Sequence, residues 1–341
     1  MNDVFSTTLL HWFSTHGRAL PWRETTDAYA IWLSEIILQQ TRVEQGRAYW
    51  HRFMQRFPDV EALAAASEDE VLRLWQGLGY YSRARNLHAA ARQVVVLGGF
   101  PRTLEGIRSL KGVGDYTAAA VASFAFGVPA AAVDGNVFRV LSRQFGINTP
   151  INTTEGKREF TALANELLPV KQAGTFNQAM MDFGATLCTP RSPRCMECPL
   201  AETCVALREG RVEALPVKLK RTMVRERRLA YIYIRCNGET AIHRRGAGDI
   251  WQGLWEPVAV MDNGQWTMDN GQSMRDEAVL LAKDVKHVLT HRILLADFYL
   301  LEATARPDLP SDYIWIPESS LDDYAKPRLI ERLVEYLPKT R

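Results

Sequence analysis

Four of the five cysteines fall within 17 consecutive positions, in the pattern C-x6-C-x2-C-x5-C made by Cys188, Cys195, Cys198 and Cys204. Four unrelated buried cysteines would not be this dense, so we expect their thiolates to hold a metal centre in one compact loop. Zinc and an iron–sulfur cluster both accept four thiolate ligands. No histidine lies among the cysteines, and the spacing alone does not choose between the two centres.

The chain differs in character on the two sides of this loop. Up to about residue 205, apolar residues recur at helical spacing. After it, "PVKLKRTMVRERR" at 216–228 is typical of a solvated basic linker, and "LAYIYIR" and "YIWIP" predict strands. We also expect helices over 275–285 and 327–337. A chain of 341 residues is long enough for two such parts, each with its own core.

Charge and apolar content narrow the class of protein. The 41 Lys and Arg nearly balance the 39 Asp and Glu, so a nucleic-acid surface must be a local concentration of basic residues. The N-terminus lacks a basic start before an apolar run, so we expect a cytoplasmic protein without membrane contact. The weakly polar run 117–133 is short and is interrupted by Gly127 and Pro129, which predicts a core helix and a turn.

A bend with two glycines lies in "LKGVGDYTA" at 110–118, between two expected helices. Gly112 and Gly114 permit positive φ angles and leave no side chain between the backbone and a ligand. The amides that begin the second helix then point outward, where they bind a DNA phosphate without reading the sequence. An ordinary turn between packed helices is the alternative, since short glycine motifs match by chance.

Aromatic and basic side chains lie close together in "GLGYYSRARNLH" at 77–88. Here Tyr80 and Tyr81 stand beside Arg83 and Arg85. Arginines hold the DNA backbone, and an aromatic ring can enter the base stack. The alternative is a solvated helix face with tyrosines in the core.

Two carboxylates have contrasting surroundings. Glu35 has Ile31, Leu38 and Gln39 one helical turn away. A carboxyl on such an apolar face has a raised pKa and suits a general acid, although an exposed surface glutamate is the alternative. Asp134 directly precedes a helix, whose N-terminus it caps and whose dipole favours its ionised form. Cleavage of a glycosidic bond needs one protonated and one charged carboxyl of this kind.

Together these motifs resemble those of the helix-hairpin-helix DNA glycosylases with an iron–sulfur loop, and among them the A/G-specific adenine DNA glycosylases. The resemblance covers nearly the whole chain. Besides the bend and the cysteine loop, it is carried by "LPWR" at 20–23, "WLSEIILQQTRV" at 32–43, "GLGYYSRARNLH" at 77–88, "VDGNV" at 133–137, "FNQAMMDFGATLC" at 176–188 and "WQGLWE" at 251–256.

The resemblance implies a base excision repair enzyme that flips adenine, paired with 8-oxoguanine or guanine, out of double-stranded DNA. Glu35 would protonate the adenine and assist the water, while Asp134 would stabilise the sugar or bond to it transiently. Asn136 and Tyr116 would support that centre. The four cysteines would hold a 4Fe–4S cluster, which decides by analogy what spacing left open. We expect a monomer, associated with the nucleoid if the source is bacterial.

The same resemblance assigns residues that would hold DNA and the flipped base. Arg23 and Asp182 match positions of the pocket that holds the base. Gln39, Gln40 and Tyr80 match positions that probe the base stack or wedge into it. All five are therefore expected to bind substrate.

The C-terminal part resembles the Nudix-like domain by which this family recognises oxidised guanine. "VLTHR" places Thr290 and His291 in a loop that would contact that base. The family loop more often reads Phe-Ser-His, whereas this chain has Leu289 and Thr290, so it lacks the stacking Phe but keeps a hydroxyl that can make the hydrogen bond. We therefore expect a multidomain chain with an all-α helix-hairpin-helix glycosylase domain over 1–207 that includes the iron–sulfur loop 188–204, a basic linker over 208–228 and an α+β Nudix-like domain over 229–341.

Two other functions were weighed against this one. A bifunctional glycosylase and lyase of the endonuclease III kind uses a lysine just after the hairpin as a nucleophile, whereas this chain has Tyr116 there, and Lys111 precedes the glycines. A non-catalytic iron–sulfur protein that binds damaged DNA would have no use for both Glu35 and Asp134. The sequence therefore favours an enzyme that removes a base without cutting the strand.

Overall fold

The computed structural model describes residues 2–219, 225–260, 274–289 and 291–338. The chain divides into two compact units, the first formed by Met1–Ala65 and Asn86–Lys220 and the second by Ala66–Arg85 and Arg221–Arg341. The short segment 66–85 thus belongs with the C-terminal residues, although it lies within the helical part of the sequence.

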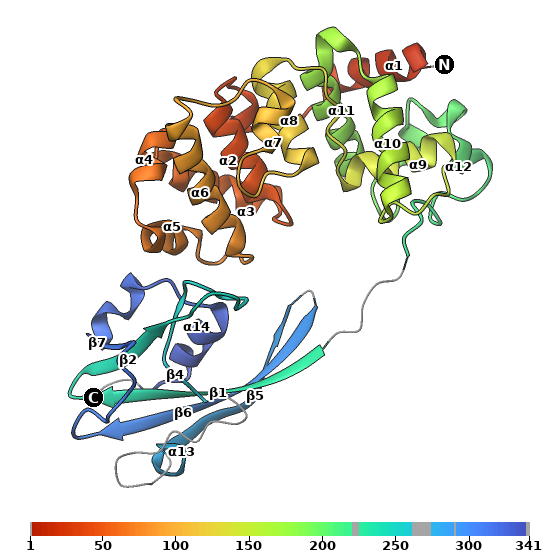
Figure 1. Ribbon diagram of the computed structural model, residues 1–341. Coiled ribbons are helices and arrows are strands. Elements are labelled where there is room, and N and C mark those ends of the chain that lie inside the picture. Colours follow the sequence, from red (N-terminus) through yellow and green to blue (C-terminus); the bar gives the residue numbers. More distant parts are fainter. Residues whose placement is uncertain (1, 220–224, 261–273, 290, 339–341) are drawn as a thin grey trace. The chain divides into compact units, whose positions relative to one another are not determined.

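Helices make up the regular structure of the described residues up to 219, as the spacing of apolar residues predicts (Figure 1). They are α1 (Asn2–His16), α2 (Ala28–Leu38), α3 (Val43–Arg56), α4 (Val60–Ala65), α5 (Glu68–Trp75), α6 (Ser82–Val96), α7 (Leu104–Arg108), α8 (Asp115–Phe126), α9 (Gly135–Phe145), α10 (Thr154–Leu167), α11 (Ala173–Thr186) and α12 (Val205–Arg208). Short 3-10 turns lie at Pro21–Arg23, Val170–Gln172, Cys195–Glu197 and Ala201–Thr203. None of the helices within the described ranges is long and apolar enough to cross a membrane.

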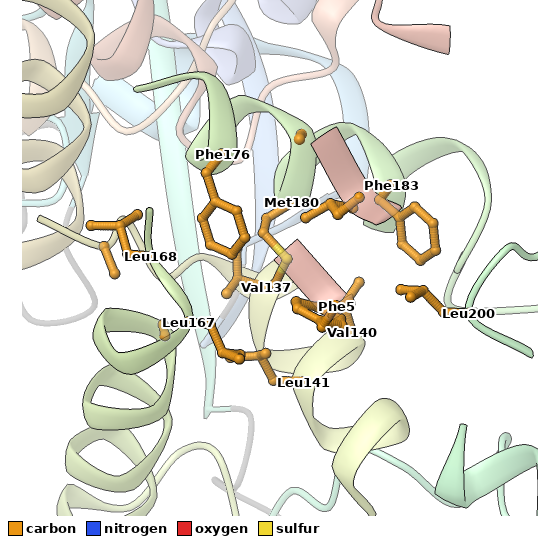
Figure 2. Packing of buried hydrophobic residues seen from close by; sticks show 14 of the residues in the cluster. Phe5, Val137, Val140, Leu141, Leu167, Leu168, Phe176, Met180, Phe183 and Leu200 are labelled. Carbon is orange, nitrogen blue, oxygen red and sulfur yellow. The ribbon is translucent and has the colours of Figure 1, made fainter. Parts of the chain in front are cut away.

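One apolar core joins α1, α9, α10 and α11, as Figure 2 shows. On α9, Val137, Val140 and Leu141 recur at the spacing of one helix face, and all three are buried. Phe176 of α11 is buried in the same cluster, and each such side chain contributes about 2 kcal/mol by leaving water. This core fixes α11, which leads directly to the cysteine loop, and α9, which lines one pocket together with the cysteines.

α2 is buried on all sides, from Ala28 to Ile37. Asp27 caps its N-terminus by accepting hydrogen bonds from the amides of Tyr29 and Ala30. A helix that is surrounded by protein has no wet face. Any charged side chain in its middle is therefore desolvated.

The glycine bend between α7 and α8 needs glycine for two reasons. Gly112 has φ of +75°, and a Cβ there would lie 2.6 Å from Cβ of Asn86. Gly114 instead faces open space, with no atom within 4 Å of an added Cβ, and it precedes α8 without a side-chain cap. The amides of the first turn of α8 are thus open to a ligand.

The second unit is built on a mixed sheet with the strand order β3-β2-β1-β6-β5, in which β4 also pairs with β1 and β7 with β2. β1 and β6 run parallel, and the other pairs are antiparallel. Cys236 is buried in β1, as expected of a cysteine without a chemical role. The elements are β1 (Arg225–Cys236), β2 (Glu239–Arg244), β3 (Trp255–Glu256), β4 (Val258–Val260), α13 (Met274–Glu277), β5 (Val279–Val288), β6 (Arg292–Ala303), β7 (Tyr313–Pro317), a 3-10 turn (Glu318–Asp323) and α14 (Arg328–Glu335).

The helix expected over 275–285 is wrong beyond its first turn. α13 ends at Glu277, and β5 begins at Val279 and pairs with β6 over its length. The run of Ala, Leu and Lys favours a helix locally, but pairing with β6 overrides this weak preference. Register shifts between Leu280 and Val285 let the strand bend. β1 likewise starts at Arg225, so the last four residues of the expected linker are part of the sheet.

Candidate active site

A cleft of about 1440 Å³ in the first unit is lined by residues of α2, α8 and α9 and the bends beside them. It brings together nine of the side chains or glycines that the sequence singled out, which are Arg23, Glu35, Gln39, Gln40, Gly112, Gly114, Tyr116, Asp134 and Asn136. In the sequence these positions are spread over more than a hundred residues, from Arg23 to Asn136. The fold therefore brings them together in one cleft.

Glu35 lies in this cleft on the buried helix α2, with only 7% of its surface exposed. Its Oε2 accepts a hydrogen bond of 2.7 Å from the hydroxyl of Tyr116 on α8. Burial raises the pKa of Glu35 to about 7; nearby Asp134 adds to this rise and the hydrogen bond from Tyr116 opposes it. The raised pKa predicted from the sequence is confirmed, and the group can carry a proton near neutral pH.

Asp134 caps α9, as predicted, by accepting hydrogen bonds of 2.9 Å from the amides of Asn136 and Val137. Burial nevertheless raises the pKa of Asp134 above its ordinary value, and these hydrogen bonds lower it only in part. The helix N-terminus thus favours the ionised form, as predicted, but desolvation, which the prediction did not include, has the larger effect on this pKa.

A chain of hydrogen bonds links Asp134 to the cysteine loop. The side-chain amide nitrogen of Asn136 donates to Asp134 Oδ2 at 2.7 Å, and the guanidinium of Arg139 donates to Asn136 Oδ1 at 2.8 Å. Arg139 also donates to the carbonyl of Cys188 at 2.8 Å. Arg139 is not among the residues predicted from the sequence, although a basic residue in the second turn of the helix that Asp134 caps was a usable signal.

Asp182 is fully buried, and both of its oxygens accept hydrogen bonds from arginines. Arg18 donates to it from the backbone and the side chain, and Arg23 binds with two bonds of 2.8 Å. Burial raises the pKa of Asp182, but the bonds from Arg23 and Arg18 outweigh it and hold that pKa below its ordinary value. Asp182 thus fixes Arg23 at the wall of the cleft, and Arg18 is a second residue that sequence reasoning missed.

Two of the residues expected to probe the base stack have unusual backbone. Gln40 has φ of 58° and Tyr80 has φ of 47°, a region that residues other than glycine rarely adopt. Such strain persists only where the surrounding structure imposes it, often at functional sites. Gln39, beside Gln40, donates from its amide to Thr117 Oγ1 at 3.3 Å. Tyr80 is 46% exposed and belongs to the second unit.

The pair expected to read oxidised guanine also belongs to the second unit. His291 is exposed in the turn between β5 and β6, where its carbonyl accepts a hydrogen bond from the amide of Arg225. Thr290 lies outside the described residues. The role given to these two residues stays a prediction.

The four cysteines line one small pocket beneath α9. Burial raises the pKa of Cys198 to about 11, and its neighbours Cys188 and Cys204 add to the rise, so four thiolates here need a positive partner. A zinc ion or an iron–sulfur cluster would supply that positive charge to four thiolate ligands.

Buried Arg143 supports the same pocket. It donates to Cys188 Sγ at 3.4 Å and to the carbonyl of Thr189 at 2.7 Å. A donor to a ligating sulfur stabilises its negative charge. The donor set and its surroundings therefore fit an iron–sulfur cluster.

Comparison with protein families gives three matches along the chain. Residues 33–168 match the HhH-GPD superfamily base excision DNA repair proteins, and residues 188–204 match the iron–sulfur binding domain of endonuclease III. Residues 230–336 match the NUDIX domain. The order of the three matches is the order of the expected parts.

Relatives extend these matches. An adenine DNA glycosylase of Buchnera aphidicola from Schizaphis graminum is 33% identical over 255 residues, which cover 74% of this chain and 74% of the relative. The chain belongs to the adenine DNA glycosylase family. The Schizosaccharomyces pombe member is 30% identical over 94% of this chain and 86% of its own. The mouse member is 45% identical over 62% of this chain, but the match spans only 44% of its own length.

Solved structures agree on the fold of the helical part. A thermostable thymine-DNA glycosylase aligns with a TM-score of 0.57 and 34% identity, over 61% of this chain and 97% of its own. A trapped endonuclease III–DNA covalent intermediate aligns with a TM-score of 0.54 over 62% of this chain and 98% of its own. At 22% identity, the second likeness concerns the fold alone. Family membership thus gives the cysteine loop its cofactor, a 4Fe–4S cluster of the endonuclease III kind.

Proposed function

We propose that this chain is a monofunctional DNA glycosylase that removes adenine paired with 8-oxoguanine or guanine. The observation that carries the proposal is the pairing of Glu35 with Tyr116 beside Asp134 in one cleft. A carboxyl with a pKa of about 7 is partly protonated at neutral pH, which is the condition for a general acid. Membership of the adenine DNA glycosylase family supports adenine as the base.

In the proposed reaction, adenosine is flipped from the duplex into the cleft. Glu35 gives its proton to the five-membered ring of adenine, and the glycosidic bond then breaks with both electrons going to the base. Asp134 faces the positive charge that develops on the sugar and stabilises it or bonds to it transiently. Glu35, now ionised, takes a proton from a water molecule, which adds to the sugar, so Glu35 regains the proton that it gave to adenine. Asn136 holds Asp134 in place throughout.

The residue after the hairpin supports base removal without strand cleavage. A lyase of the endonuclease III kind forms its Schiff base with a lysine placed directly after the hairpin. Tyr116 stands there, and burial raises its pKa well above the ordinary value, so it stays a neutral donor. Lys111 is exposed and is not among the residues that line the cleft.

Binding of DNA would use several contacts. The open amides after Gly114 would hold a phosphate, and Gln39, Gln40 and Tyr80 would probe or wedge the base stack. Arg23, fixed by Asp182, would hold the flipped base. Thr290 and His291 would contact the oxidised guanine. We propose that the protein acts as a monomer in the cytoplasm.

The test is a release assay on duplexes that carry one 8-oxoguanine·adenine, guanine·adenine or guanine·thymine pair. We expect adenine release from the first two, with strand breaks only after alkali. Breaks without alkali through a borohydride-trapped intermediate would contradict the monofunctional assignment. Release of thymine instead would contradict adenine as the base and would indicate the specificity named for the similar thymine-DNA glycosylase.

Glu35→Gln is the variant that isolates the acid. It should bind the duplex as well as the native protein does but release adenine at least ~100-fold more slowly, the usual contribution of a general acid. Glu61→Gln, at an exposed position of α4, is the matched control. Unchanged turnover in Glu35→Gln would remove Glu35 from this role.

A further inference from the structure

The motif "WQGLWE" has no role in the proposed chemistry. Its first four residues end a loop, residues 245–254, that joins β2 to β3, and its last two residues form β3. The loop is closed at its base, because Arg245 N donates to Leu254 O and Gly253 N donates to Arg245 O, both at 2.9 Å. A closed ten-residue loop with backbone bonds across its neck has a fixed shape.

Buried charges inside the loop hold its tryptophan. Arg245, with a side chain only 6% exposed, donates to Asp249 Oδ1 at 3.0 Å and also to Glu256. The same Asp249 oxygen accepts the amide of Trp251 at 2.9 Å. The Arg245 guanidinium lies 5.5 Å from the centre of the Trp251 ring, within the range of a cation–π contact. Trp251 is thus held by a hydrogen bond at its backbone and by the Arg245 guanidinium at the face of its ring.

Trp251 packs against the hairpin that ends in the expected guanine-reading turn. Its buried ring lies 6.0 Å from the ring of His287, at the end of β5. His287 pairs with Leu294 across the β5–β6 hairpin, and Leu289 N donates to Arg292 O at 2.8 Å to close the turn. His291 lies inside that turn. The ring of Trp251 therefore supports the strand end that leads directly to His291.

Near its tip the hairpin is held mainly by backbone bonds. Arg225 N of β1 donates to His291 O at 3.3 Å, and the pairing of β1 with β6 begins at Arg292. Side-chain packing there is sparse, because Val288 is 66% exposed and Lys286, His291 and Arg292 are exposed as well. Arg332 of α14 adds one hydrogen bond of 2.8 Å to the carbonyl of Lys286. The Trp251 ring is therefore a main side-chain contact of the strand end, and its loss should change the position of the turn relative to the β1 edge.

The far side of the loop is fixed within the second unit by the segment 66–85. Arg85 donates to the carbonyl of Gln252 at 2.6 Å, and Arg244 pairs with Glu68 at 2.9 Å. Gly253, with φ of +82°, lets the backbone approach so closely that a Cβ would lie 3.1 Å from Glu68 Oε1. A loop held from one side and packed against the hairpin on the other is a rigid support.

We propose that Trp251 is a positioning residue that sets the place of the His291 turn and so determines the preference for oxidised guanine opposite the adenine. This inference rests on the proposed function, because that function assigns the oxidised base to the turn. Trp251 itself touches no substrate. Its effect should appear in discrimination between opposing bases and not in adenine chemistry.

The experiment compares dissociation constants for two duplexes, with 8-oxoguanine or guanine opposite a non-cleavable 2′-fluoro adenosine analogue. Trp251→Leu should lower the preference for 8-oxoguanine about tenfold, equal to the loss of one hydrogen bond. Trp251→Phe, which keeps a ring against His287, should retain the preference. The guanine duplex should bind both variants within about twofold of the native protein.

Two controls separate the possible failures. Trp255→Leu removes a tryptophan of the same domain that packs on Tyr324, and it should keep the preference. An equal loss in Trp255→Leu would mean general destabilisation and would overturn the inference. His291→Ala tests the proposed function of the turn. If His291→Ala lowers the preference for 8-oxoguanine but Trp251→Leu does not, the positioning role of Trp251 is refuted and the role of the turn stands. If neither variant lowers the preference, the turn does not recognise the oxidised base.

Discussion

Removal of the Tyr116 hydroxyl should move the pH dependence of base release to higher pH. Tyr116 donates its hydrogen bond to Glu35 at 2.7 Å, and a bond to the carboxylate favours the ionised form. The bond therefore lowers the pKa of Glu35, against burial, which raises it to about 7. Tyr116→Phe removes the opposing effect, so the pKa of Glu35 should rise further.

The size of the change follows from the strength of one hydrogen bond. A bond of this kind contributes about 1.4 kcal/mol, which is about one pH unit in the pKa of its acceptor. Base release requires the protonated acid, so the rate falls as pH rises through the pKa of Glu35. With a pKa of about 7 for Glu35, we expect that fall near pH 7 in the native protein and about one pH unit higher in Tyr116→Phe.

The assay is single-turnover release of adenine from an 8-oxoguanine·adenine duplex, measured from about pH 5 to pH 9.5. Tyr29→Phe is the matched control, since its buried hydroxyl bonds to the Phe57 carbonyl and not to Glu35. Its profile should coincide with that of the native protein. A fall in rate that stays in place, or moves to lower pH, in Tyr116→Phe would refute the assignment of this limb to Glu35.

Three other variants test other parts of the site. Gly112→Ala places a side chain at positive φ and should weaken binding to every duplex about tenfold, measured by fluorescence anisotropy; sequence-dependent weakening would argue against a phosphate contact. Cys198→Ser should lose bound iron and visible absorbance, whereas Cys236→Ser should keep both. Arg139→Met removes the donor to Asn136 Oδ1 and should slow adenine release ~10-fold at unchanged DNA affinity; equal rates would mean that the link from the cysteine loop does not affect Glu35 and Asp134.

The fold was predictable where local patterns and packing agree. The apolar spacing on α9 predicts the face that packs into the core, and Gly112 was predictable because φ above zero favours glycine. The strand β5 was not predictable, because the helix preference of residues 275–285 is local, whereas its partner β6 comes later in the chain. Pairing of this kind is invisible to a window of ten residues.

The candidate site was predictable in its members but less so in their environment. Glu35 and Asp134 were found from their apolar and helix-capping contexts, and both lie in the cleft. Arg18 and Arg139 were missed because their partners, Asp182 and Cys188, are 164 and 49 residues away. Arg139 is a buried arginine on an amphipathic helix, and such a residue looks like a surface residue until its acceptors are known.

Division of labour between the two carboxyls depends on hydrogen-bond donors and not on helix position alone. Burial raises the pKa of both, so desolvation does not distinguish them. Asp134 receives two backbone amides and the side-chain amide of Asn136, whereas Glu35 receives the hydroxyl of Tyr116. Each donor favours the charged form, and the charge on Asp134 in turn raises the pKa of Glu35. Asp134, the carboxyl with more hydrogen-bond donors, therefore becomes the anion, and its charge keeps the proton on Glu35.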